Sequence, residues 1–151
     1  MLTFQQCDLF ESGCQALVNP VNCVGVMGKG LALVFRRRFP EVYDDYRAAW
    51  RAGLLSIGHV HVSPVAPRPD TDAEWVIHFP TKNDWRQPSE LAYIARGLAD
   101  LGRVIVERDF RSVAMPALGC GLGGLPRQPV LDLIAEHLKA IPVSIRVCLD
   151  S

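Results

Sequence analysis

The chain has 151 residues, enough for one domain with its own core, and its formal net charge is zero with 49% apolar and 21% charged residues. Zero net charge argues against general electrostatic binding of nucleic acid, because such binding needs many uncompensated basic side chains. No apolar run approaches the roughly 20 residues of a membrane span, and residues 1–8 lack the pattern of a signal peptide. We therefore expect a cytoplasmic, monomeric protein without membrane association.

The five cysteines form no C-x-x-C pair and are expected to be reduced thiols that pack as small apolar groups. No Cys/His spacing matches a zinc site. We expect neither a metal nor a cofactor.

Apolar runs and helical periodicity alternate along the chain. The predicted strands are residues 2–6, 16–19, 59–63, 74–79, 112–115 and 144–149. The predicted helices are residues 31–39, 41–52, 89–107 and 129–140. The second strand is expected to stop at Asn19 and Pro20, because proline cannot donate to a strand ladder. Residues 80–88 are expected to form a loop.

This alternation predicts an α/β fold with a largely parallel sheet of about six strands and helices on both faces. Ligands of such folds bind at the carboxyl ends of the strands. The segments that follow the predicted strands are Asp8 and residues 19–30, 80–86 and 119–125. We expect them to share one rim.

The most informative segment is residues 116–125, which lies between a predicted strand and a predicted helix. Four glycines in six residues allow backbone N–H groups to approach a ligand closely, and a helix N-terminus follows. The segment favours a phosphate or pyrophosphate site; the alternative is a glycine-rich turn that only packs against the sheet. It formally fits G-x-G-x-x-G, but only one strand follows and the expected acidic residue is missing, which disfavours a dinucleotide domain.

A second glycine-rich loop, residues 25–30, also runs into a predicted helix. It is not a P-loop, because Gly28 and Lys29 are followed by glycine rather than Ser or Thr. Two such loops could hold a diphosphate from opposite sides. Asn19 and Asn22 flank Pro20 and Val21 ahead of this loop, and their amides could contact a ribose or only bond their own backbone.

These motifs, in this order, resemble a macrodomain over essentially the whole chain. The resemblance is carried by Asp8, residues 18–22, the two glycine-rich loops and residues 79–82, Phe-Pro-Thr-Lys. Within the macrodomains, the sequence is most similar in these motifs to the Alc1-like class. The resemblance implies a single macrodomain over residues 1–151 with a three-layer α/β/α fold and a mixed, largely parallel sheet.

The resemblance also implies roles for individual residues. Asp8 would accept a hydrogen bond from adenine, Asn22 would lie by the distal ribose, and Lys82 matches the catalytic lysine of the class. The expected catalytic residues are thus Lys82 and Asn22. The expected ligand-binding residues are Asp8, Leu9, Asn19, Gly28, Lys29, Gly30, Leu118, Gly119, Cys120, Gly121, Leu122, Gly123 and Gly124.

The implied activity is ADP-ribosyl hydrolysis: removal of ADP-ribose from modified macromolecules by attack at the distal ribose C1″. The expected partners are ADP-ribose and ADP-ribosylated protein carboxylates or thymidine-linked DNA. The alternative is a module that reads ADP-ribose without hydrolysis. Two features depart from relatives within the class. Gly123 stands where the vertebrate relative has an aspartate, and Pro126 and Arg127 replace an acidic residue and a tryptophan.

Other side chains in the pattern have ordinary interpretations. The four histidines, His59, His61, His78 and His137, are expected to be surface or packing groups rather than general bases. Cys120 is expected to pack within its loop. Trp85 and Arg86, close to Lys82, could stack on a base or contact the modified group, or could only anchor an exposed loop.

Overall fold

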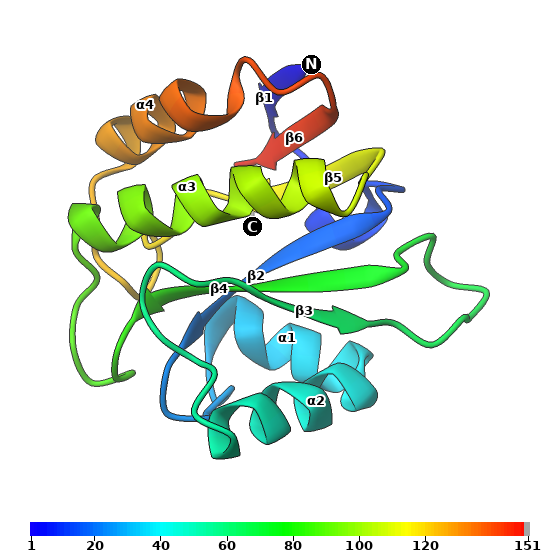
Figure 1. Cartoon of the computed structure of the whole chain (residues 1–151), viewed down its shortest axis with the longest axis vertical. Helices are drawn as coiled ribbons and strands as arrows, with labels where there is room; N and C mark the ends of the chain where they lie inside the picture. The colour runs from blue at the N-terminus through cyan, green and yellow to red at the C-terminus, as the bar shows by residue number, and fades with distance from the viewer. Residues whose placement is uncertain (150–151) are drawn as a thin grey trace.

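The computed structural model describes residues 1–149, and within them one six-stranded sheet is flanked by helices (Figure 1). The strands are β1 (Leu2–Gln5), β2 (Ala16–Asn22), β3 (His61–Pro64), β4 (Trp75–Lys82), β5 (Ser112–Pro116) and β6 (Ser144–Cys148). The helices are α1 (Gly30–Arg38), α2 (Pro40–Arg51), α3 (Leu91–Glu107) and α4 (Arg127–Leu138), with a short 3₁₀ turn, η1 (Leu9–Glu11).

The strand order is β1-β6-β5-β2-β4-β3, and every neighbouring pair is parallel except β3–β4. The predicted mixed, largely parallel sheet is therefore confirmed. Five strands point their carboxyl ends toward the same edge, which is where ligands of open α/β sheets bind.

The helices form two outer layers, with α3 and α4 on one face of the sheet and α1 and α2 on the other (Figure 1). Successive residues of β2 contribute to the two hydrophobic cores. Val18 packs with Leu98 and Ile134 on the α3–α4 side, and Leu17 packs with Phe35 on the α1 side. Each fully buried side chain of this size contributes about 1.5–3 kcal/mol. Burial on both faces explains why the central strands β2 and β4 each begin with three consecutive apolar residues.

Two strands are longer than the sequence predicts. We expected β2 to stop at Asn19, but it continues through Pro20 to Asn22. The pairing of β2 with β5 covers only Ala16 and Leu17, whereas β4 remains paired along the other side. Pro20 thus lies beyond the segment bonded to β5, where its missing N–H breaks no ladder on that side.

The expected loop at residues 80–88 is also wrong at its start, because β4 continues to Lys82. Asn22 and Lys82 are consequently register partners at the ends of neighbouring strands, just after an irregularity in the β2 ladder. The two residues expected to be catalytic are 60 positions apart in sequence and adjacent in the sheet.

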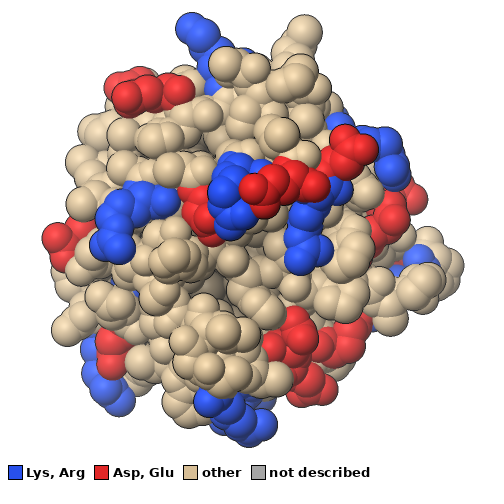
Figure 2. Space-filling view, viewed as in Figure 1, with Lys and Arg blue, Asp and Glu red and all other residues tan. Residues whose placement is uncertain are grey.

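Acidic and basic side chains are mixed on the face that α3 covers, as Figure 2 shows. Part of this mixture is a chain of ion pairs on α3, in which Arg103 contacts Asp100 and Glu107. None of the helices within residues 1–149 is both long enough and apolar enough to cross a membrane.

Candidate ligand-binding site

Three loops meet at the carboxyl edge of the sheet. The β2–α1 loop (residues 23–29) and the β5–α4 loop (residues 117–126) contain the glycine-rich segments, and the β4–α3 loop (residues 83–90) follows Lys82. A Cβ built on Gly30 would lie 3.1 Å from Leu122 Cδ1, so the start of α1 and the β5–α4 loop are in near contact. Lys82 Nζ donates a hydrogen bond to the carbonyl oxygen of Leu122 at 3.4 Å. The structure therefore brings both glycine-rich loops and the expected catalytic lysine together.

Asn22 uses its side chain to hold the β2–α1 loop. Its Oδ1 accepts hydrogen bonds from Val24 N at 3.0 Å and from the Tyr46 hydroxyl at 2.9 Å, and its Nδ2 donates to the carbonyl oxygen of Val26 at 2.8 Å. Burial raises the pKa of Tyr46, which keeps the hydroxyl a donor. Asn22 thus orders the loop beside Lys82, and its catalytic role stays a prediction. The sequence offered no signal for the Tyr46 contact beyond an apolar helix position.

The glycines of the β5–α4 loop serve different purposes. Gly119 has a φ of 75°, which favours glycine. Gly121 is exposed, and a Cβ built on it meets no heavy atom within 4 Å. At Gly123, by contrast, a Cβ would lie 2.5 Å from the carbonyl oxygen of Gly119 and closer still to the hydroxyl of Ser89. The loop is therefore open where a ligand could approach at Gly121 and closed behind Gly123.

Ser89 is the packing residue that sequence reasoning missed, because we expected it to start a helix. It is buried, it precedes α3, and its N–H donates to the carbonyl oxygen of Gly123 at 3.0 Å. Among the described residues its hydroxyl has no hydrogen-bond partner. The contact explains why no side chain fits at 123 in this conformation.

Asp8 lies just after β1 at the same edge. Its Oδ1 accepts a hydrogen bond from Phe10 N at 2.8 Å and so caps η1. The carboxylate is exposed, while the adjoining Leu9 is fully buried in the core. The cap fixes the position of the carboxylate, which remains available in solvent. Contacts with adenine stay a prediction for both residues.

Asn19 lies deeper than the sequence suggests. It is fully buried, its Nδ2 lies 3.4 Å from His78 Nδ1, and its Oδ1 has no partner among the described residues. His78 is fully buried too, and its Nε2 lies 2.9 Å from Ser63 Oγ. Burial lowers the pKa of His78 to about 3, so the ring is neutral near pH 7 and acts as a packing group, as expected. Ligand contact by Asn19 stays a prediction.

The remaining predicted residues lie on the two glycine-rich loops. Gly28 and Lys29 are exposed and directly precede α1, whose first residue is Gly30. Leu118 is fully buried, and Leu122 is 66% exposed. Burial raises the pKa of the Cys120 thiol, which agrees with packing rather than with a reactive thiolate.

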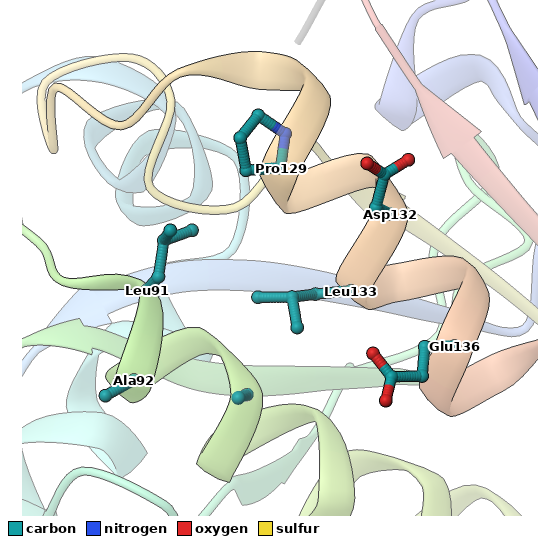
Figure 3. A pocket seen from close by; sticks show the side chains of 7 residues that line it. Leu91, Ala92, Pro129, Asp132, Leu133 and Glu136 are labelled. Carbon is teal, nitrogen blue, oxygen red and sulfur yellow. The ribbon is translucent and has the colours of Figure 1, made fainter.

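A shallow groove of about 430 Å³ lies elsewhere, between α3 and α4 (Figure 3). Leu91 and Ala92 face Leu133 and Pro129 across it, with Glu136 at one end. None of the predicted site residues lines it. Among residues 1–149, no group of three or more His, Cys, Asp or Glu side chains is placed to hold a metal ion.

The close packing behind Gly123 gives a direct prediction. Gly123→Ala should lower the melting temperature by about 2–12 °C, because forcing one methyl group into a packed space costs about 1–3 kcal/mol. The matched control is Gly121→Ala, whose methyl group enters open space. Thermal unfolding of both variants tests this, and equal melting temperatures would contradict the packing assignment.

The sequence matches the profile of the Macro domain over residues 18–134. A curated relative from Mycobacterium tuberculosis, the DNA ADP-ribosyl glycohydrolase, is 45% identical over 142 residues, which cover 94% of this chain and 40% of the relative. The chain thus spans less than half the length of the curated relatives that it matches so well.

Solved structures of macrodomains are also similar to this chain. The macrodomain of Mycobacterium tuberculosis DarG superposes with a TM-score of 0.94 at 43% identity, covering 100% of this chain and 99% of that one. Thermosipho africanus DarTG in complex with ADP-ribose superposes with a TM-score of 0.92 at 34% identity, covering 98% of this chain and 41% of that one. The predicted three-layer α/β/α arrangement is confirmed. Because the profile match covers more than half of the sequence, the chain belongs to the Macro domain family.

Proposed function

We propose that this macrodomain binds ADP-ribose at the carboxyl edge of its sheet and removes it from modified DNA by cleaving the bond at the distal ribose C1″. The observation that carries the proposal is the pairing of Asn22 with Lys82 where the glycine-rich loops meet. In this proposal the amine of Lys82 lies beside the seat for the phosphates. Relatives named as DNA ADP-ribosyl glycohydrolases support DNA as the macromolecule.

In this proposal the ligand lies along the edge from β1 to β4. The adenine amino group donates to Asp8, and the diphosphate lies against backbone N–H groups around Gly121 and at the start of α1 near Gly30. The distal ribose then reaches Lys82. Binding energy from the distant adenine and phosphates positions C1″ for reaction.

The first test is binding. At a hundredfold excess over its Kd, ADP-ribose should raise the melting temperature by about 5–10 °C, because a ligand that binds only the folded state adds about 2.7 kcal/mol of stability. Calorimetry should show the matching heat. Neither a heat nor a thermal shift at millimolar ADP-ribose would refute the proposal.

The second test is turnover, which separates a hydrolase from a reader module. The purified protein is incubated with an ADP-ribosylated single-stranded oligonucleotide and, separately, with a protein that carries ADP-ribose on carboxylates. Release of ADP-ribose from the oligonucleotide is the expected result. Release only from the modified protein would reassign the substrate, and tight binding without release from either would favour the reader.

A further inference from the structure

The β4–α3 loop is held between the two glycine-rich loops. At its start, the carbonyl oxygen of Asn83 accepts a hydrogen bond from Cys23 N at 3.0 Å, which ties it to the β2–α1 loop. At its end, Ser89 N donates to the carbonyl oxygen of Gly123 at 3.0 Å, which ties it to the β5–α4 loop. The segment between these anchors borders the place where Lys82 contacts Leu122.

This segment presents an aromatic ring in a fixed setting. Trp85 is 45% exposed, and the Arg86 guanidinium lies over its ring at 4.7 Å from the centroid. Asp84 organises the turn: its Oδ1 accepts from Arg86 N at 2.9 Å, and its carbonyl oxygen accepts from Gln87 N at 3.1 Å. A ring carried on an ordered turn loses less conformational entropy when a ligand stacks on it than a ring on a flexible segment does.

We propose that Trp85, backed by Arg86, is the platform on which a base of the ADP-ribosylated DNA stacks. This inference rests on the proposed function. ADP-ribose would occupy the edge from Asp8 to Lys82, so the group attached at C1″ must leave the site beyond Lys82. Trp85 is three residues further along the chain, in the loop that closes this end of the site.

The charges around Trp85 favour contact with a nucleic-acid base over contact with a phosphate backbone or a carboxylate. Arg86 also pairs with Asp84, with 3.4 Å between Arg86 NH1 and Asp84 Oδ2, so its charge is partly compensated. The chain as a whole has no net charge to attract a phosphate backbone. Stacking needs only the π-face that every base has, and a carboxylate on a protein acceptor has none to offer.

The experiment compares three substitutions at Trp85. Trp85→Ala should lower kcat/KM on an ADP-ribosylated single-stranded oligonucleotide by about 5- to 150-fold, the range typical of one lost base–aromatic stack. Trp85→Phe should retain most of the parent kcat/KM, whereas Trp85→Leu, which is apolar but has no π-face, should not. The Kd for free ADP-ribose should be unchanged in all three. Val106→Ala, at a similarly exposed position near the far end of α3, is the control for loss of surface apolar area.

Binding supplies a second readout that does not depend on turnover. The parent protein should bind the modified oligonucleotide more tightly than free ADP-ribose, and Trp85→Ala should remove that difference. If the parent binds but releases no ADP-ribose, the proposed hydrolysis fails while this readout still tests the platform. Equal behaviour of the parent and Trp85→Ala on the oligonucleotide would overturn the inference. So would a Trp85→Ala defect seen only with an ADP-ribosylated protein substrate.

Discussion

Replacing Gly121 by glutamate should abolish ADP-ribose binding while leaving the fold intact. The position is exposed and a Cβ there meets no atom within 4 Å, so the new side chain has room at the rim without disturbing the core. The carboxylate would nevertheless occupy the expected diphosphate seat. Like charges facing each other cost several kcal/mol, which corresponds to an affinity loss of about 100-fold or more.

The measurement pairs affinity with stability. Calorimetry should detect no ADP-ribose binding to Gly121→Glu, while its ligand-free melting temperature should stay within about 2 °C of the parent, as for ordinary surface substitutions. Gly121→Gln is the matched control, because it adds nearly the same volume without the charge and should bind better than the glutamate variant. Unchanged affinity in a folded Gly121→Glu protein would show that the diphosphate does not lie at this loop.

The layers and most of the sheet could be predicted because the signals are local. A buried parallel strand is a continuous apolar run, and a helix that covers a sheet repeats its apolar face, so windows such as residues 91–105 suffice. The strand ends were harder. A proline normally stops a strand, but Pro20 sits where β2 has already left β5, and this depends on pairings that the local sequence does not encode.

The candidate site also combines features that the local sequence predicts with features that it does not. The glycine-rich loops can be recognised from their composition, whereas the contacts that shape them link distant parts of the chain. Tyr46 holds Asn22 across 24 positions, and Ser89 packs behind Gly123 from the preceding loop. The glycine at 123 could be read from the sequence, but the packing of Ser89 that leaves no room for a side chain there could not.

Lys82→Ala should lose most hydrolysis and still bind ADP-ribose. The lysine is half-buried at the end of β4, and its amine donates a hydrogen bond to the carbonyl oxygen of Leu122. This contact holds the amine where the distal ribose is expected. Removal of one group that acts in the transition state typically lowers kcat by about 10²- to 10⁴-fold. The Kd for ADP-ribose should change little, because the adenine and phosphate contacts remain. Lys139→Ala, an exposed lysine after α4, is the control.

Two roles for the amine are distinguishable. As a nucleophile, the neutral amine attacks C1″, the C1″–acceptor bond breaks with its electron pair and a proton going to the acceptor, and opening of the ribose ring leaves an imine that water hydrolyses to ADP-ribose and free Lys82. As a cation, it only stabilises charge that develops in the transition state. Gly123 supplies no carboxylate in this chain, so in this proposal water or a substrate phosphate carries the proton.

Lys82→Arg separates these roles, because arginine keeps the positive charge but cannot form the imine. Retained hydrolysis would support the cation, and loss equal to that of Lys82→Ala would support the nucleophile. Borohydride provides an independent measurement: reduction in the presence of ADP-ribose should add the ligand covalently at Lys82, located by peptide mass, only if the imine forms. Turnover by Lys82→Ala at the parent rate would remove Lys82 from the reaction. The next candidates would then be Asn22 and residues 28–30, which border the same end of the site.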